Sequence, residues 1–114
     1  MIMGLFLKEL NVTKILERGA FKVWEEIKVG EKVFLKLEET NKNTILVEVE
    51  KGGQKMVFGE LPEKESEVIR SFLTQKWNDV FEAYICKKDN DVPLYDQRIS
   101  IAVYIEENKE VIAK

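Results

Sequence analysis

The residues best suited to chemistry in this chain are basic and aromatic side chains near its amino terminus. Lys14, Arg18 and Lys22 recur every four residues, and Phe21 and Trp24 lie beside them. Cations interleaved with exposed aromatic rings are typical of surfaces that bind single-stranded nucleic acid, because rings stack on bases and cations contact phosphates. The pattern therefore favours a groove that receives the end of a nucleic-acid strand.

The same residues also allow a purely structural interpretation. Phe21 and Trp24 would then fill the core, and the basic residues would only keep the surface soluble. Lys87 and Lys88 form a second basic pair further along the chain. The candidate nucleic-acid-binding residues are Lys14, Arg18, Phe21, Lys22, Trp24 and Lys42, the last of which lies in a polar turn.

The sequence shows no recognisable catalytic or metal-binding motif. It contains no histidine and one cysteine, Cys86, so neither a Cys–His pair nor a cysteine–histidine zinc site is available. Residues 88–91, KDND, lack the spaced acidic ligands of a calcium loop. Because no phosphate-binding loop, nucleophile elbow or dinucleotide fingerprint is present, we expect no catalysis and no cofactor.

Composition limits the class of protein further. The 114 residues fit one domain, 1–114, and 45% hydrophobic with 34% charged residues is ordinary globular composition. A net charge of −3 argues against binding nucleic acid through bulk positive charge but allows a local basic patch. The single cysteine fits a reducing compartment, and the apolar start MIMGLFL is too short to span a bilayer. We therefore expect a cytoplasmic protein with no membrane partner.

Alternation of apolar and polar side chains predicts the strands that would position the candidate residues. The predicted strands cover residues 4–12, 32–38, 44–50, 55–61, 80–87 and 97–106. Gly52-Gly53 supplies the positive φ angles of a tight hairpin between the third and fourth strands. We expect a mainly β fold, a small antiparallel β-barrel of about six strands, because closure removes exposed strand edges. Residues from 107 onward are expected to be frayed.

One short and one long α-helix are predicted beside the strands. Val23, Trp24 and Ile27 give one apolar side to a short helix at 23–27. Pro62 suits the first turn of a longer helix at about 63–76, which would plug one opening of the barrel. The apolar stripe of the longer helix contains Val68, Ile69, Phe72, Leu73 and Trp77.

The order of these features resembles the HIRAN domain family in its small stand-alone bacterial form. The resemblance covers roughly residues 5–106. It rests on Val23-Trp24, Val29-Gly30-Glu31, Gly59-Glu60-Leu61-Pro62 and the closing strand. It implies a small β-barrel with flanking helices, recognition of single-stranded or damaged DNA ends, and no catalysis by the domain itself.

Three segments differ from the DNA-binding members of that family. Those members carry an Arg-Tyr-Tyr-like cluster where this chain has Leu16-Glu17-Arg18, and an Asn-Pro-Tyr-Asp loop where it has ETNKN at 39–43. Many also carry a basic residue where Glu63 follows the Gly-x-x-Pro step. Each exchange removes a stacking surface or a phosphate partner.

Two functional hypotheses remain open at the level of the sequence. The first is a HIRAN-like module that binds DNA, whether single strands or ends. The second is a protein-interaction or self-association domain in which the apolar first strand adds to a neighbouring sheet.

Overall fold

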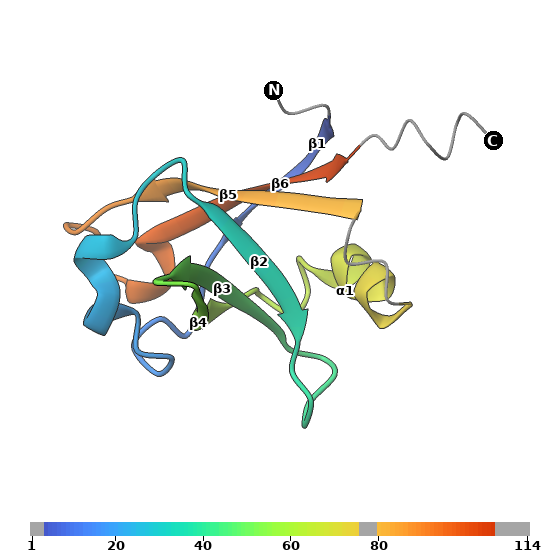
Figure 1. Ribbon diagram of the computed structural model, residues 1–114, viewed down its shortest axis with the longest axis horizontal. Coiled ribbons are helices and arrows are strands. Elements are labelled where there is room, and N and C mark those ends of the chain that lie inside the picture. Colours follow the sequence, from blue (N-terminus) through green and yellow to red (C-terminus); the bar gives the residue numbers. More distant parts are fainter. Residues whose placement is uncertain (1–3, 76–79, 107–114) are drawn as a thin grey trace.

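A computed structural model describes residues 4–75 and 80–106 of the chain (Figure 1). Within these ranges the chain forms six strands, one α-helix and two 3-10 helices, the last labelled η. The elements in chain order are β1 (Gly4–Asn11), η1 (Ala20–Glu26), β2 (Lys32–Leu37), β3 (Ile45–Lys51), β4 (Gln54–Glu60), α1 (Glu67–Thr74), β5 (Phe81–Lys88), η3 (Tyr95–Gln97) and β6 (Ile99–Glu106). The prediction of a small, mainly β fold with six strands is confirmed.

The six strands form one antiparallel sheet in the order β1-β6-β5-β2-β3-β4. The sheet curls until its two ends approach at Thr13 and Glu60. There, the Thr13 amide donates to Glu60 O at 2.7 Å and the Glu60 amide donates to Thr13 O at 2.9 Å. Among the described residues no further pair joins β1 to β4, so the sheet is barrel-like in curvature but not a closed barrel.

The core lies on the inner face of this curled sheet. Along β3, the side chains of Ile45, Val47 and Val49 are fully buried, as the alternation predicts. Along β6, the central Ile101 and Val103 are equally buried. Burying apolar area of this kind stabilises the fold by roughly 25 cal/mol per Å², so the inner face supplies most of the driving force for folding.

The short helix differs in type from its prediction. Residues 20–26 form the 3-10 helix η1, which follows Gly19 in the left-handed region (φ 81°) and is kinked at Val23 (φ −121°). The buried side chains here are those of Ala20 and Val23 within η1 and of Ile27 directly after it. The predicted helix at 23–27 overlaps η1 but begins three residues later, and the kink at Val23 breaks the continuous α-helical hydrogen bonding that was expected.

The longer helix is shorter than predicted. Residues 62–66 form a turn in which Ser66 Oγ donates to Pro62 O at 2.6 Å, and α1 begins only at Glu67. Ile69 and Leu73 are buried as expected, but Val68 is 57% exposed and does not belong to the buried stripe. Lys76, Trp77 and the residues from 107 onward lie outside the described residues.

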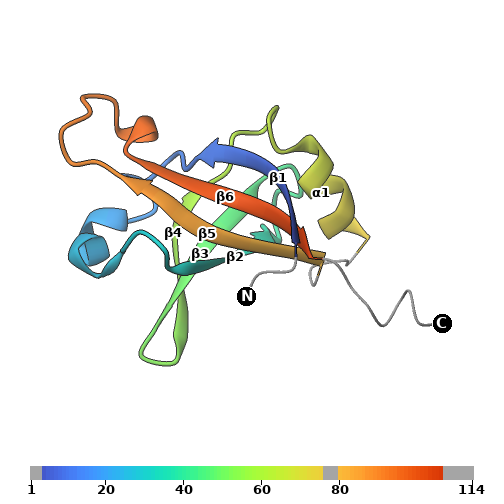
Figure 2. The same cartoon turned by 90° about the horizontal axis from the view of Figure 1, so that it is seen from above.

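The two main helical elements lie at opposite ends of the sheet (Figure 2). η1 lies beside the loop that joins β5 to β6, and α1 lies at the other end, near the end of β2 (Figure 1). The predicted plug of one opening therefore corresponds to α1. The candidate aromatic residues of η1 are placed at the opposite end.

Candidate nucleic-acid interface

Two aromatic rings stack on the surface of η1. The ring centroids of Phe21 and Trp24 lie 5.0 Å apart with an interplanar angle of 25°. The two residues lie three positions apart, on either side of the kink at Val23. Tyr95 of η3 meets Phe21 edge-on at 5.4 Å. Phe21 and Tyr95 keep 37% and 44% of their surface exposed, so the rings form a platform open to solvent.

Two cations lie over these rings. Lys88 Nζ is 5.0 Å from the centroid of Trp24, and Arg98 Cζ is 4.7 Å from that of Tyr95 and 6.0 Å from that of Phe21. We call these five residues the end cluster. Each cation is worth about 0.5–1 kcal/mol to its ring at an exposed site. A ligand that offers both a flat ring and an anion would engage both kinds of group.

Hydrogen bonds hold the end cluster in place. Trp24 Nε1 donates to Asn90 Oδ1 at 2.6 Å, and Lys88 Nζ donates to the Trp24 carbonyl at 2.5 Å. Arg98 Nε donates to Val92 O at 2.7 Å. η1 is thereby tied to the β5–β6 loop, from which it is more than sixty residues distant in sequence. The platform is consequently preorganised, and binding would need little reordering.

The structure brings four of the six candidate residues to this end of the molecule. Phe21 and Trp24 form the platform, and Lys22 is exposed on the same helix. Lys14 is also exposed, and its backbone amide donates to Asp96 Oδ1 at 3.0 Å, directly beside Tyr95. These four residues therefore lie at the η1 end of the molecule.

Lys42 lies elsewhere. It is exposed in the β2–β3 turn and lines a shallow hollow with Glu67, Arg70 and Thr74 of α1. The elements that line this hollow, α1 and the β2–β3 turn, lie away from η1 (Figure 1). Lys42 is therefore not part of the end cluster.

Arg18, the sixth candidate residue, lies in an ion-paired group with two glutamates. Its Nη2 lies 2.7 Å from Glu60 Oε2 and 3.2 Å from Glu38 Oε2, and its Nε donates to Glu60 at 2.8 Å. The hydrogen bond that Arg18 donates to the Glu60 carboxylate raises the pKa of Arg18, and a smaller effect of burial opposes it. Since two carboxylates already neutralise its charge, Arg18 is poorly available to a phosphate.

Sequence reasoning missed Tyr95 and Arg98 and noted Lys88 only as one of a basic pair. Lys88 precedes a polar loop that shows no periodic pattern, and Tyr95 and Arg98 follow it. The sequence does place this tyrosine and this arginine three residues apart, a spacing that can bring their side chains together on one helical turn. Their meeting with η1 depends on the fold and could not be inferred from local spacing.

The described residues also bear on metal binding, membrane spanning and thiol reactivity. Within residues 4–75 and 80–106 there is no group of three histidine, cysteine or acidic side chains able to hold a metal ion. In the same ranges no helix is long and apolar enough to cross a membrane. Desolvation and the nearby charge of Glu9 raise the pKa of the Cys86 thiol, which therefore stays protonated at neutral pH.

Fold and site together define a small antiparallel β protein that presents an aromatic, cation-flanked cluster at one end. A scan against protein-family models, a search of curated proteins and a search of solved structures found no match to the chain.

Proposed function

We propose that this chain is a non-catalytic, HIRAN-like module that binds single-stranded nucleic acid, such as single-stranded or damaged DNA ends, through the end cluster. The observation that supports this most directly is the exposed stack of Phe21 on Trp24, with Tyr95 at its edge and Lys88 and Arg98 over the rings. Stacking of a base on such a ring is worth about 1–3 kcal/mol and tolerates any base sequence.

The proposed surface differs from the one that the resemblance implies. The segments that depart from the family pattern include the one ending at Arg18, the turn that follows Glu38 and the step that contains Glu60. In the structure these three residues form one ion-paired group. This group contains one cation and two carboxylates, so its net charge is negative. Glu63, three residues after Glu60 in the chain, is exposed. A phosphate would be repelled there, which favours the end cluster as the binding surface.

The direct test is the affinity for a fluorescein-labelled oligothymidylate, measured by fluorescence anisotropy at low salt. Phe21→Ser is expected to weaken binding about ten- to hundredfold, because one base loses its stacking partner. Arg98→Gln is expected to reduce the slope of log K against log salt by about 0.7, as one phosphate contact disappears.

Lys42→Gln serves as the control, because it removes a positive charge far from the end cluster and should leave affinity nearly unchanged. The proposal fails if the unmodified protein binds neither single- nor double-stranded DNA at low salt. It also fails if Lys42→Gln weakens binding as much as Phe21→Ser.

A second candidate function, self-association or protein interaction, is favoured by one observation. Phe6 on the edge strand β1 is 60% exposed, and its ring packs against Tyr104 in a T-shaped arrangement with 5.6 Å between the centroids. An exposed aromatic ring on a sheet edge is a feature of surfaces that pair with another strand. A sedimentation coefficient that rises with protein concentration would support this alternative.

A further inference from the structure

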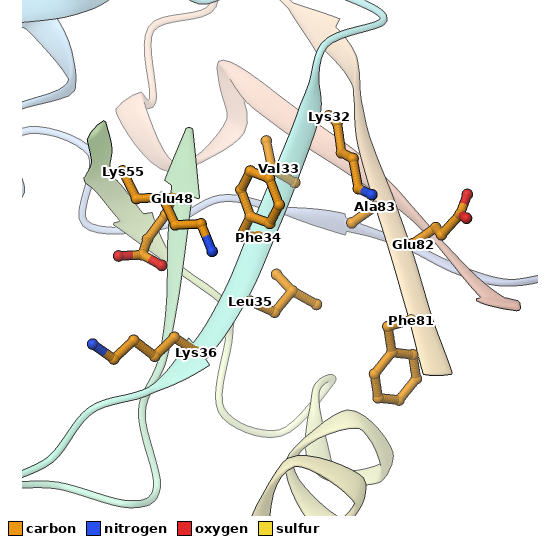
Figure 3. A pocket seen from close by; sticks show the side chains of 10 residues that line it. All are labelled: Lys32, Val33, Phe34, Leu35, Lys36, Glu48, Lys55, Phe81, Glu82 and Ala83. Carbon is orange, nitrogen blue, oxygen red and sulfur yellow. The ribbon is translucent and has the colours of Figure 1, made fainter. Parts of the chain in front are cut away.

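A second concave surface lies on the outer face of the sheet, away from the end cluster. It is an open groove of about 620 Å³ centred on β2. Figure 3 shows its lining side chains, which come from β2, β3, β4 and β5. We call it the β2 groove and define it by Lys32, Phe34, Leu35, Lys36, Lys55 and Phe81.

The groove exists because β2 and β5 diverge. Among the described residues, the ladder between these strands contains only the pairs Lys32–Tyr84 and Val33–Ala83. Beyond Val33 the strands separate, and Leu35 and Phe81 lie in the gap between them (Figure 3). The gap thus exposes apolar surface that a continuous ladder would have covered.

Two lysines lie over the aromatic ring of Phe34, and a third, Lys36, also lines the groove. Lys32 and Lys36 lie two residues before and after Phe34, so all three side chains share the outer face of β2. Lys55 Nζ, from β4, lies 4.3 Å from the centroid of Phe34, and Lys32 Nζ lies 5.7 Å from it. None of these lysines forms an ion pair among the described residues.

Two carboxylates also line the groove, Glu48 and Glu82. Glu82 accepts a hydrogen bond from Tyr84 Oη at 2.8 Å, which engages part of its charge within the sheet. Three lysines against two glutamates leave the groove with one net positive charge, on a chain whose total charge is −3. The groove therefore attracts anions relative to the rest of the surface.

We propose that the β2 groove is a second contact for the same single-stranded nucleic acid, holding one or two nucleotides beyond those on the end cluster. The lysines would contact phosphates, and a base would rest on Phe34, beside the half-buried Leu35 and Phe81 that pack against the core in the gap. This inference rests on the proposed function, because it extends the path of that strand. A groove that follows the backbone while rings receive bases is the common arrangement for single strands.

The chemistry of the groove favours this ligand over an acidic peptide. Cations directly over an aromatic ring suit a ligand whose anionic groups and flat rings alternate at short intervals, as phosphates and bases do. The volume lies within the range of about 300–1,000 Å³ that is typical of small-ligand sites. A duplex would not present its stacked bases to the gap between β2 and β5, so an unpaired strand is required.

The first test uses charge and ring variants in the anisotropy assay with labelled oligothymidylate. Lys55→Glu and Phe34→Thr are each expected to weaken binding about tenfold, and Lys55→Glu to lower the salt slope by about 0.7. Lys64→Glu is the matched control, because it makes the same charge change at an exposed residue that does not line the groove. Equal losses in Lys55→Glu and Lys64→Glu would overturn the inference.

The second test needs no variant. Titration of the isotope-labelled protein with oligothymidylate is expected to shift the backbone amide resonances of 32–36 and 81–83 together with those of η1. Shifts at η1 alone would overturn the inference and leave the proposed function standing. Absence of shifts anywhere would overturn both. Shifts at 32–36 with an acidic peptide but not with oligothymidylate would also overturn the inference, in favour of a protein partner.

Discussion

At the scale of single residues, Arg18 shows how partners distant in sequence decide what a charged side chain does. Its spacing from Lys14 and Lys22 suggested a basic stripe, yet Glu38 and Glu60 bind it from 20 and 42 residues away. The side chains of Arg18, Glu38 and Glu60 keep only 29%, 25% and 18% of their surface accessible. An ion pair screened from water to this degree is stronger than an exposed one. Arg18 therefore joins the start of η1 to the ends of β2 and β4.

Removal of this cation is expected to destabilise the fold. Arg18→Gln leaves Glu38 and Glu60 close together without a counter-charge, and we expect unfolding to become about 2 kcal/mol easier. Urea denaturation followed by circular dichroism measures this change. The double variant Arg18→Gln/Glu60→Gln should recover part of the loss, because it removes one of the two repelling carboxylates. A single variant as stable as the parent protein would show that the ion pairs contribute nothing.

At the scale of elements, β4 and the segment after β1 approach each other closely at Gly59. A Cβ atom at Gly59 would lie 2.2 Å from Val12 Cγ1 and 3.0 Å from Thr13 O. Val12 is fully buried and Thr13 carries the bridge to Glu60, so neither neighbour has room to withdraw. Glycine at 59 is thus required by packing, since only a hydrogen fits between the two ends of the curled sheet.

Gly59→Ala is therefore expected to cost about 1–3 kcal/mol of stability through overpacking. Thermal unfolding of the parent, Gly59→Ala, Val12→Ala and the double variant forms a complete cycle. The double variant should be less destabilised than the sum of the single ones, because Val12→Ala removes the nearest clashing methyl group. Strict additivity would contradict the assigned contact.

The strands could be predicted from the sequence because each carries its own period-two pattern, as in Ile99–Glu106. The type of η1 could not, since its apolar spacing fits a 3-10 and an α-helix equally over so short a length. The order of the strands depends on pairing between distant segments, such as Lys32 with Tyr84. Phe21 and Trp24 could be predicted as candidates because they lie close together in the sequence. Tyr95 and Arg98 could not, because only the fold brings them to η1.

At the scale of the whole molecule, the open sheet leaves two edges that another chain could pair with. The β1 edge contains a bulge between Phe6 and Lys8, and Lys8 Nζ donates to Glu65 O at 2.7 Å. The turn before α1 therefore approaches the middle of this edge. The β4 edge is occupied at one end by the bridge from Thr13 to Glu60. Bulges, charged side chains and covering segments are the features that keep sheet edges from pairing.

These edge features predict a monomer, despite the exposed ring of Phe6. The sedimentation coefficient of the parent protein should stay constant as the protein concentration rises. In Lys8→Thr it should become concentration-dependent, because the variant loses both the charge and the hydrogen bond to Glu65. Lys36→Thr is the matched control, because it makes the same change on β2, which lies inside the sheet. A parent protein that dimerises, and becomes monomeric in Phe6→Ser, would contradict this prediction and favour self-association as the function of the β1 edge.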